Sequence, residues 1–149
     1  MFEPKKILVP TDFSEHSDKA LREALDIAER YNSQIYLLHV IDQNIQQCVV
    51  DYCLPQETVD QLERESENKS REMMQEEVAK VAPRRAVEIN YDIKRGVPYD
   101  VILKEEDDKN VDLIVIASRG KDGLIGHLMG NVADRVSERA KSEVLIVKT

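Results

Sequence analysis

The sequence predicts an α/β protein in which five parallel strands form one sheet, with helices on both faces. Short apolar runs, typical of strands buried on both faces, alternate along the chain with segments of helical periodicity. The order is strand–helix repeated four times and then a last strand, which favours crossover connections and a parallel sheet. No repeat, linker or low-complexity tract interrupts the 149 residues, so we expect one domain over residues 1–149.

The first half of the chain supplies two strands and one helix. Residues 7–10 are a continuous apolar run that predicts a buried strand, and Pro10 stands at its carboxyl end, where a missing N–H is tolerable. Ser14 and Ser17 are candidate caps for a helix that ends near residues 31–32, because alanines and leucines follow at helical spacing. Two segments come next: a strand at 34–41 and a loop without period at 42–55.

A long helix is expected from about Pro55 to Ala82, and Pro83 ends it. Its inward-facing residues trace a stripe that weakens in the middle, and glutamates occupy much of the remaining surface. We interpret this segment as a surface helix with a solvated acidic face; the alternative, a partner-binding helix, has no anchor residue to support it. The stripe consists of Val59, Leu62, Ser66, Lys69, Met73, Val78 and Val81.

The second half of the chain repeats the alternation. Residues 87–93 alternate with period two, as a half-exposed strand does, and residues 96–98 turn the chain. The remaining elements are a helix over 99–109 with Val101, Ile102 and Leu103 inward, a continuous apolar strand over 112–117, a helix over 131–141 with Val132, Val136 and Ala140 on one face, and a last strand over 144–147.

Composition excludes several classes of partner. The formal net charge is -8, so phosphate-rich surfaces would be repelled and we expect neither nucleic acid nor membrane as a partner. No apolar run approaches the roughly 20 residues that a membrane span needs, and the apolar run near the start is too short for a signal peptide. Cys48 and Cys53 are spaced neither as a redox CxxC nor as a zinc site. A cytoplasmic location is therefore expected.

A crevice for a ligand is expected where the sheet reverses its winding. If the strand order is 3-2-1-4-5, this point lies between the first and fourth strands, which Asp12 and the segment 117–120 follow. Nine residues after Gly120 come Gly130 and Asn131, where a helix begins. Glycines allow close backbone approach, and a helix N-terminus offers N–H groups and partial positive charge, so this segment predicts a cradle for phosphate.

No catalytic constellation is visible. The chain has no G-x-S-x-G elbow, no P-loop and no Rossmann dinucleotide fingerprint after its first strand. His16, His39 and His127 are too scattered to suggest a metal site; we interpret His127 as a surface residue and His39 as a hydrogen-bonded structural residue. We name no catalytic residue.

Four segments carry a family resemblance: KILVPTDFS at 6–14, LLHVID at 37–42, DLIVI with SRG between 112 and 120, and residues 130–147. With these segments the chain resembles, over essentially its whole length, the universal stress proteins of the UspA superfamily. The resemblance implies a Rossmann-like fold of the adenine nucleotide alpha hydrolase type. It also implies a homodimer formed through the last strand, by Val144, Leu145, Ile146 and Val147.

The ATP-binding branch of this family carries the motif G-x2-G-x9-G-[S/T]. Gly120 and Gly130 match its second and third glycines, whereas Ala117 and Asn131 replace its first glycine and its hydroxyl residue. The implied ligand is ATP, with or without Mg²⁺, or else ADP or AMP. The implied nucleotide-binding residues are Pro10, Thr11, Asp12, Val40, Ile116, Ala117, Ser118, Arg119, Gly120, Gly130, Asn131 and Val132.

Several roles follow for single residues. The resemblance places Asp12 near ribose or adenine, where a carboxylate can accept hydrogen bonds from the ribose hydroxyls or the adenine amine. The alternative is that Asp12 caps the next helix. Val40 would contact the base, and Pro10 and Thr11 would shape the same wall. Arg119 and Lys121 either steer phosphates or are solvated loop cations.

The two altered motif positions leave the function open. Asn131 keeps donors for a phosphate and remains a good helix cap. Alanine at 117 would cost about 1–2 kcal/mol if the site needs a positive φ there, and its methyl group could also meet the ligand. Three functions follow: a homodimeric nucleotide-binding regulator or sensor of stress, a dimeric interaction module that has lost nucleotide binding, and a weak ATPase.

Overall fold

A computed structural model describes residues 1–41, 53–83, 86–120 and 131–149. Within these ranges five parallel strands form one sheet in the order β3-β2-β1-β4-β5, which confirms the predicted fold class and strand order. The elements are β1 (Lys6–Pro10), α1 (Glu15–Tyr31), β2 (Gln34–Ile41), α3 (Gln56–Val81), β3 (Ile89–Arg95), α4 (Pro98–Lys109), β4 (Leu113–Ala117), α5 (Asn131–Arg139) and β5 (Glu143–Val147).

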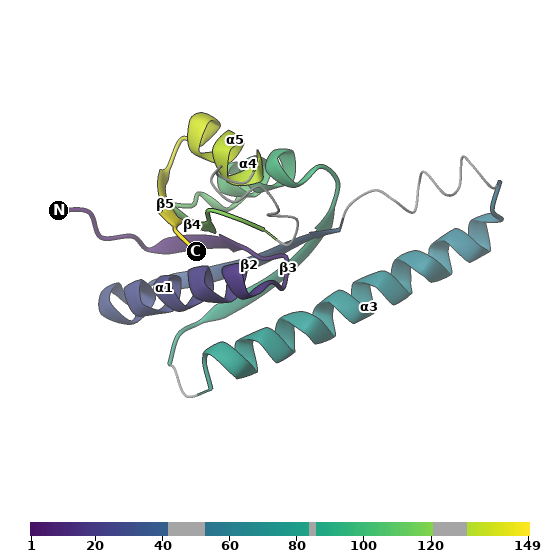
Figure 1. Ribbon diagram of the computed structural model, residues 1–149, viewed down its shortest axis with the longest axis horizontal. Helices are drawn as coiled ribbons and strands as arrows, with labels where there is room; N and C mark the ends of the chain where they lie inside the picture. Colours follow the sequence, from purple (N-terminus) through teal and green to yellow (C-terminus); the bar gives the residue numbers. More distant parts are fainter. Residues whose placement is uncertain (42–52, 84–85, 121–130) are drawn as a thin grey trace.

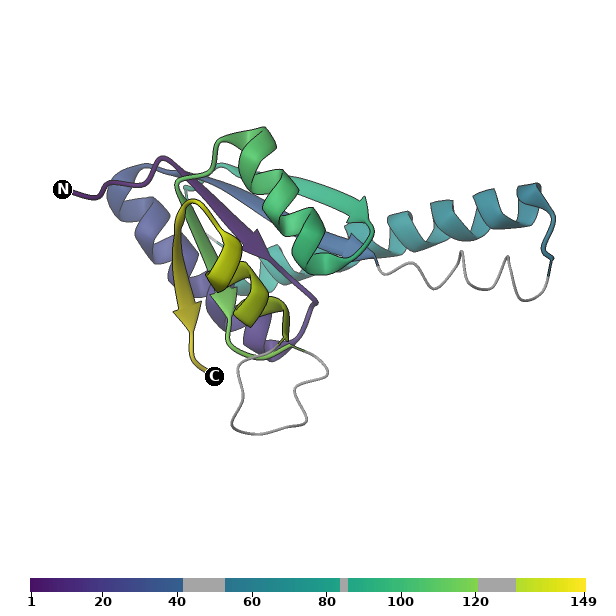
Figure 2. The ribbon, with the colours of Figure 1, turned by 90° about the horizontal axis from the view of Figure 1, so that it is seen from above.

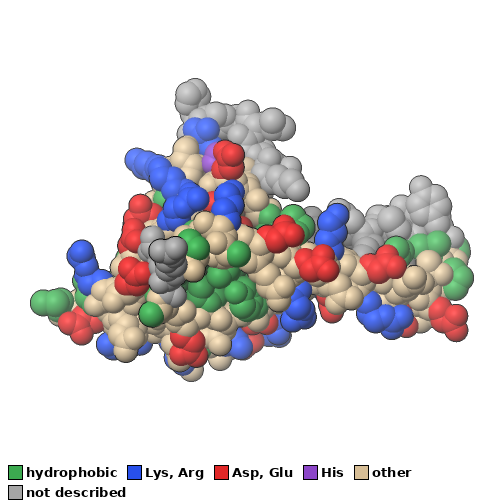
Figure 3. All heavy atoms as spheres, turned by 90° about the horizontal axis from the view of Figure 1, so that it is seen from below, with side chains coloured by type: hydrophobic (Ala, Val, Ile, Leu, Met, Phe, Trp, Pro, Cys, Tyr) green, Lys and Arg blue, Asp and Glu red, His purple; other side chains and the backbone are tan. Residues whose placement is uncertain are grey.

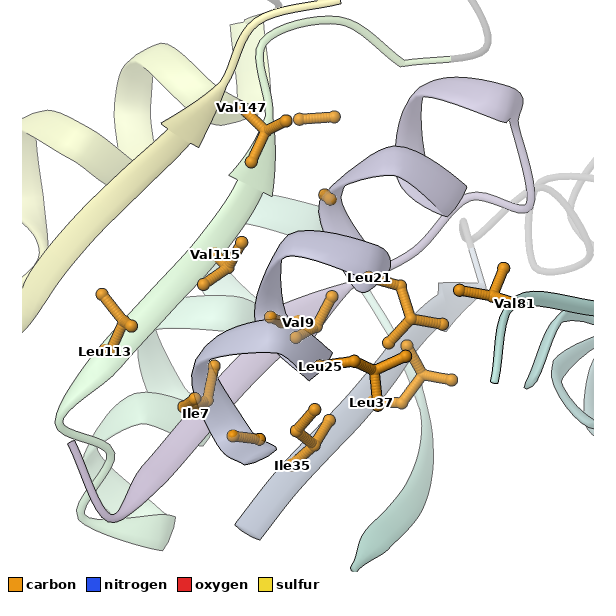
Figure 4. Close-up of a cluster of buried hydrophobic side chains, with 14 of the residues drawn as sticks. Ile7, Val9, Leu21, Leu25, Ile35, Leu37, Val81, Leu113, Val115 and Val147 are labelled. Carbon is orange, nitrogen blue, oxygen red and sulfur yellow. The ribbon is translucent and has the colours of Figure 1, made fainter. Parts of the chain in front are cut away.

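The helices cover both faces of the sheet, as the sequence predicts (Figure 1). Because side chains alternate along a strand, β1 directs Ile7 and Val9 to one face and Leu8 to the other. Ile7 and Val9 pack with Leu21 and Leu25 of α1 in the core shown in Figure 4. On the other face Leu8 belongs to a second core, to which α4 and α5 contribute Ile102, Ala133 and Val136.

The long helix α3 lies beside α1 at its C-terminal end, while its N-terminal part extends beyond the sheet (Figures 1 and 2). Both acidic and basic side chains lie along this extended arm (Figure 3). Arg95, at the end of β3, connects the middle of α3 to the sheet. Its Nη2 donates to the Glu63 carbonyl oxygen at 2.6 Å and lies 3.2 Å from Glu67 Oε1.

The predicted inward stripe of α3 is wrong at two positions: Leu62 is 37% exposed, and Lys69 is exposed. Ser66, Met73 and Val78 are partly buried, and Val78 packs against the core. Toward the C-terminal end the buried face consists of Ser70, Met74, Glu77 and Val81, spaced by three or four residues. Glu77 belongs to this face because its carboxyl group accepts a hydrogen bond from the buried Thr11 hydroxyl. Hydrophobic periodicity alone therefore placed the inward face of this end of the helix one residue out of phase.

Two elements differ from the prediction by two residues. β3 extends over 89–95 instead of 87–93, because it pairs with β2 as far as Ile41 opposite Arg95. α5 ends at Arg139, two residues earlier than expected. Most of the expected loop at 42–55 lies outside the described residues. Among the helices that the structure describes, none is both long and apolar enough to cross a membrane.

Candidate functional site

The ends of β1 and β4 lie side by side, because these two strands pair in parallel. Asp12 follows β1 and Gly120 follows β4 at this edge of the sheet. A Cβ atom added to Gly120 would lie 2.7 Å from Asp12 Oδ2, closer than real Cβ contacts come. Residue 120 therefore has to be glycine while Asp12 keeps its position, so the two features singled out in the sequence lie against each other.

The Asp12 carboxylate is held from the side of α1. Its Oδ1 accepts hydrogen bonds from Ser14 N at 3.0 Å, from Ser17 Oγ at 2.7 Å and from Ser14 Oγ. Ser14, not Asp12, is the N-cap of α1, and its Oγ accepts from Ser17 N at 3.2 Å. The alternative in which Asp12 itself caps the helix is thus wrong; Asp12 instead accepts hydrogen bonds from the serines at the N-terminus of α1.

The turn that contains Asp12 is also fixed from the sheet. Thr11 N donates to the Leu38 carbonyl oxygen at 2.8 Å, and the Thr11 carbonyl oxygen accepts from His39 Nδ1 at 2.8 Å. A carbonyl can only accept, so Nδ1 of His39 carries the proton. This confirms the interpretation of His39 as a hydrogen-bonded structural histidine. Phe13 adopts a left-handed conformation, with φ of 67°, and its ring centroid lies 4.3 Å from that of His39.

A buried carboxyl group on α3 reaches the same turn. Glu77 Oε2 accepts a hydrogen bond from Thr11 Oγ1 at 2.8 Å, while Glu77 Oε1 is buried without a hydrogen-bond partner among the described residues. Burial raises the pKa of Glu77 to about 8, and the neighbouring Asp18 adds to the increase. Asp18 is itself buried and forms an ion pair with Lys80 at 2.8 Å.

The sequence-based prediction missed this acidic pair. The signal was present: Glu77 is in helical phase with Met74 and Val81, and Thr11, a buried hydroxyl, needs an acceptor. A pocket of ≈ 170 Å³ opens beside the pair, lined by Phe13, Asp18, Met73, Glu76, Glu77 and Lys80.

Ala117 is the last residue of β4 and pairs with Val147. Its φ is not positive, and its methyl group is buried in the core beneath α1. The backbone strain considered for alanine at this motif position is therefore absent from this structure. The methyl group fills part of the core.

Two polar side chains of the motif segment are engaged within the chain. Ser118 Oγ accepts from Thr149 N at 3.2 Å, and Ser118 N donates to the Val147 carbonyl oxygen at 2.9 Å. Asn131, the first residue of α5, accepts from Arg135 Nε through its Oδ1 at 3.3 Å. Arg119 is half-buried and makes interactions of its own. Three residues of the prediction lie outside the described residues: Gly130, Lys121 and His127.

The apolar candidates gather on one face of the sheet. Ile116 is buried in the core beneath α4 and α5, and Val40 and Val132 pack against the same core. Pro10 is half-buried at the end of β1. Three predicted residues thus belong to the core on the α4 side of the sheet or pack against it. Over the part of the chain that is described, no group of three His, Cys, Asp or Glu side chains could hold a metal ion.

Comparison with known proteins agrees with this architecture. The family model of the universal stress protein family matches residues 3–148. The chain is 35% identical over 145 residues to the universal stress protein MJ0531 of Methanocaldococcus jannaschii, a match that covers 97% of this chain and 82% of that protein. The solved structure of protein MJ0577 from the same organism aligns with a TM-score of 0.84 and 29% identity, over 99% of this chain and 98% of that one.

A more distant structure is that of a universal stress protein in complex with cAMP, at a TM-score of 0.69 and 22% identity, covering 99% of this chain and 98% of that chain. At this identity the likeness concerns the fold. The family match extends over nearly the whole sequence, and the sheet order and strand ends are those of a doubly wound α/β protein. The chain therefore belongs to the universal stress protein family.

Proposed function

We propose that this chain, a single domain over residues 1–149, is a cytoplasmic, homodimeric regulator or sensor of stress that binds ATP or a related adenine nucleotide. The ligand would lie at the ends of β1 and β4. There Asp12 would accept hydrogen bonds from the ribose or the adenine amine, and the segment 117–120 with Gly130 and Asn131 would receive the phosphates. Mg²⁺ would arrive with the nucleotide, because a polyphosphate supplies its own oxygen ligands.

The observation that carries this proposal is the close approach of Asp12 to Gly120. A fixed carboxylate opposite a glycine backbone pairs an acceptor for hydroxyls with a surface that a phosphate can approach. Val40 and Ile116 on the adjoining face offer apolar contact to a base. The complex of a distant family member with cAMP supports the ligand class.

The experiment is calorimetric titration of the nucleotide-stripped protein with ATP, ADP, AMP and cAMP, each with and without Mg²⁺. We expect saturable binding of at least one adenine nucleotide, and no binding of a pyrimidine nucleotide at the same concentrations. Absence of saturation up to millimolar concentrations of every adenine nucleotide would contradict the proposal.

Gly120→Ala is the matching variant. Its Cβ has to displace the Asp12 carboxylate, so we expect affinity to fall by about tenfold or more, the equivalent of about 1.4 kcal/mol. Ser137→Ala, on the exposed side of α5, serves as the control and should bind as the wild type does. The urea midpoint of each variant distinguishes a damaged site from a damaged fold.

A second candidate function is a dimeric interaction module without nucleotide binding. It is favoured by the internal bonds of Ser118 and Asn131, which occupy two polar side chains of the motif segment. Both candidates include the dimer.

In the described sheet β5 is an edge strand, and Leu145 on it is 38% exposed. Pairing β5 with its two-fold mate would cover this edge. Leu145→Lys is expected to yield monomers in sedimentation.

A further inference from the structure

The Thr11–Phe13 turn connects α3 to the proposed nucleotide site through one hydroxyl group. Thr11 Oγ1 donates its single proton to Glu77 Oε2 at 2.8 Å. The same oxygen accepts from Phe13 N at 3.1 Å. Because the proton points to Glu77, a lone pair of the hydroxyl is left to face Phe13. The glutamate on α3 thereby determines how the hydroxyl supports the turn.

This support matters because Phe13 is in a conformation that side chains disfavour. Its φ of 67° is left-handed, which a non-glycine residue keeps only where its surroundings hold it there. The bond from Phe13 N to Thr11 and the ring contact with His39 are two such restraints. Asp12 stands between Thr11 and Phe13, so the direction of its carboxylate toward Gly120 depends on the same turn.

We propose that Glu77 is a positioning residue of the nucleotide site, which fixes the 11–13 turn so that docking of α3 on the sheet and nucleotide binding strengthen each other. This inference rests on the proposed function. Linkage then requires that a nucleotide which prefers the fixed turn also tightens α3 against α1.

The charges around Glu77 give the coupling a pH dependence. Three groups face it from other elements: Asp18 on α1, Asp12 after β1, and the Thr11 hydroxyl, with His39 of β2 behind on the Thr11 carbonyl. On α3 itself, Glu76 and Lys80 line the same pocket. With a pKa of about 8, Glu77 is protonated at neutral pH, so it adds no second negative charge beside Asp18, which forms its ion pair with Lys80.

Loss of that proton at higher pH places a negative charge beside Asp18 and within electrostatic reach of Asp12. This added charge would repel the phosphates of a nucleotide bound at Asp12. Nucleotide affinity should therefore decrease as pH rises through the pKa of Glu77. A glutamine at 77 keeps the hydrogen bond from Thr11, which its carbonyl oxygen accepts, and its amide group faces Asp18 without a proton that can be lost.

The test compares Glu77→Gln, Glu77→Met and Glu76→Gln by titration with ATP in excess Mg²⁺ at pH 7 and pH 9. At pH 7 we expect Glu77→Gln and Glu76→Gln to bind like the wild type, and Glu77→Met to bind about tenfold more weakly, since one hydrogen bond and the turn it supports are lost. Between pH 7 and pH 9 the affinity of the wild type should fall several-fold relative to Glu77→Gln. Titration of the ATP phosphates cancels in that ratio.

The Phe13 amide gives a readout without nucleotide. Its hydrogen exchange should be faster in Glu77→Met than in the wild type, and unchanged in Glu76→Gln. If Glu77→Met does not fold, Thr11→Val removes the same bond from the other side with little change in volume, and the same losses are expected.

Three results would overturn the inference. If the wild type binds ATP and Glu77→Met binds it equally well at both pH values, only the positioning role of Glu77 fails. If the wild type binds no adenine nucleotide, the proposed function fails and the inference falls with it. Loss of affinity in Glu77→Met that Glu77→Gln does not rescue would also count against positioning by these hydrogen bonds.

Discussion

Two buried glutamates on opposite faces of the sheet, Glu77 and Glu105, have the same local chemistry but different connections. Each lies beside an aspartate, each has a buried oxygen without a hydrogen-bond partner among the described residues, and each has a raised pKa, to about 8 for Glu77 and about 7 for Glu105. In both cases burial is the main cause and the neighbouring aspartate adds to it.

The two glutamates differ in what they bind. Glu77 accepts a hydrogen bond from the hydroxyl of Thr11, which follows β1 and precedes Asp12. Glu105 on α4 faces Asp92 and Lys94 of the edge strand β3, with Lys94 Nζ at 3.8 Å from its Oε1. Burial of a carboxyl pair therefore does not by itself indicate a site. What distinguishes Glu77 is a hydrogen bond to a turn that positions a candidate ligand group.

Glu77→Gln should produce the largest change in how stability depends on pH. The pKa of Glu77 is raised from 4.5 to about 8 in the folded protein, so the folded state binds more protons than the unfolded state between these values. The free energy of unfolding therefore falls as pH rises across this window, by at most about 1.4 kcal/mol per pH unit. We expect Glu77→Gln to remove on the order of 2–4 kcal/mol of this loss between pH 5 and pH 8.5.

Urea denaturation at pH 5, 6.5 and 8.5 measures this change directly. Glu76→Gln, which removes an exposed charge one residue away, is the control and should leave the slope as in the wild type. Equal pH slopes in the wild type and in Glu77→Gln would contradict a protonated Glu77 in the folded protein.

Glu105→Gln should act in the same direction but less strongly. Its window is narrower, from 4.5 to about 7, and Lys94 and Lys109 oppose the effect of Asp92. We expect on the order of 1–2 kcal/mol of the pH-dependent loss to disappear, with nucleotide affinity and Phe13 exchange unchanged. A change of either readout in Glu105→Gln would show that the two faces of the sheet are coupled, and would end the contrast drawn between the two glutamates.

Thr11→Val is expected to lower stability by about 1–2 kcal/mol at pH 7, because it leaves a buried Glu77 oxygen without its donor. A double-mutant cycle of Thr11→Val with Glu77→Met should give a coupling energy of about 1 kcal/mol. Thr11→Val with Glu105→Gln should instead be additive within about 0.5 kcal/mol. Additivity in the first cycle would mean that the Thr11–Glu77 bond contributes nothing to stability.

The fold could be predicted from the sequence because continuous runs of apolar residues mark its central strands. Residues 7–10 and 113–117 are apolar throughout, and the structure buries β4 completely between two layers of helices. The meeting of Asp12 and Gly120 followed from the strand order, since parallel neighbours bring their carboxyl ends to one edge.

Glu77 could not be predicted in the same way. Apolar periodicity finds the inward face of a helix only if that face is apolar, and here Ser70 and Glu77 occupy two of its positions. The burial of Glu77 depends on Thr11 and Asp18, which are far away in the sequence. The left-handed conformation of Phe13 could not be predicted either, because contacts with Thr11 and His39 impose it.

The lysines beside the two carboxyl pairs offer the finest test of the contrast. Lys80 Nζ lies 2.8 Å from Asp18 Oδ2, and the Asp18 side chain is only 6% exposed. Lys80→Met should therefore lower the urea midpoint, and more so at pH 8.5 than at pH 6, since at high pH two carboxylates would lack their counter-charge. Lys94→Met should change it little at either pH, because its carboxylate partners lie at 3.8 and 4.0 Å and Lys109 remains 3.8 Å from Asp92. Equal effects of the two substitutions would mean that charge alone governs both faces, and that Lys80, Asp18, Glu77 and Thr11 do not act as a unit.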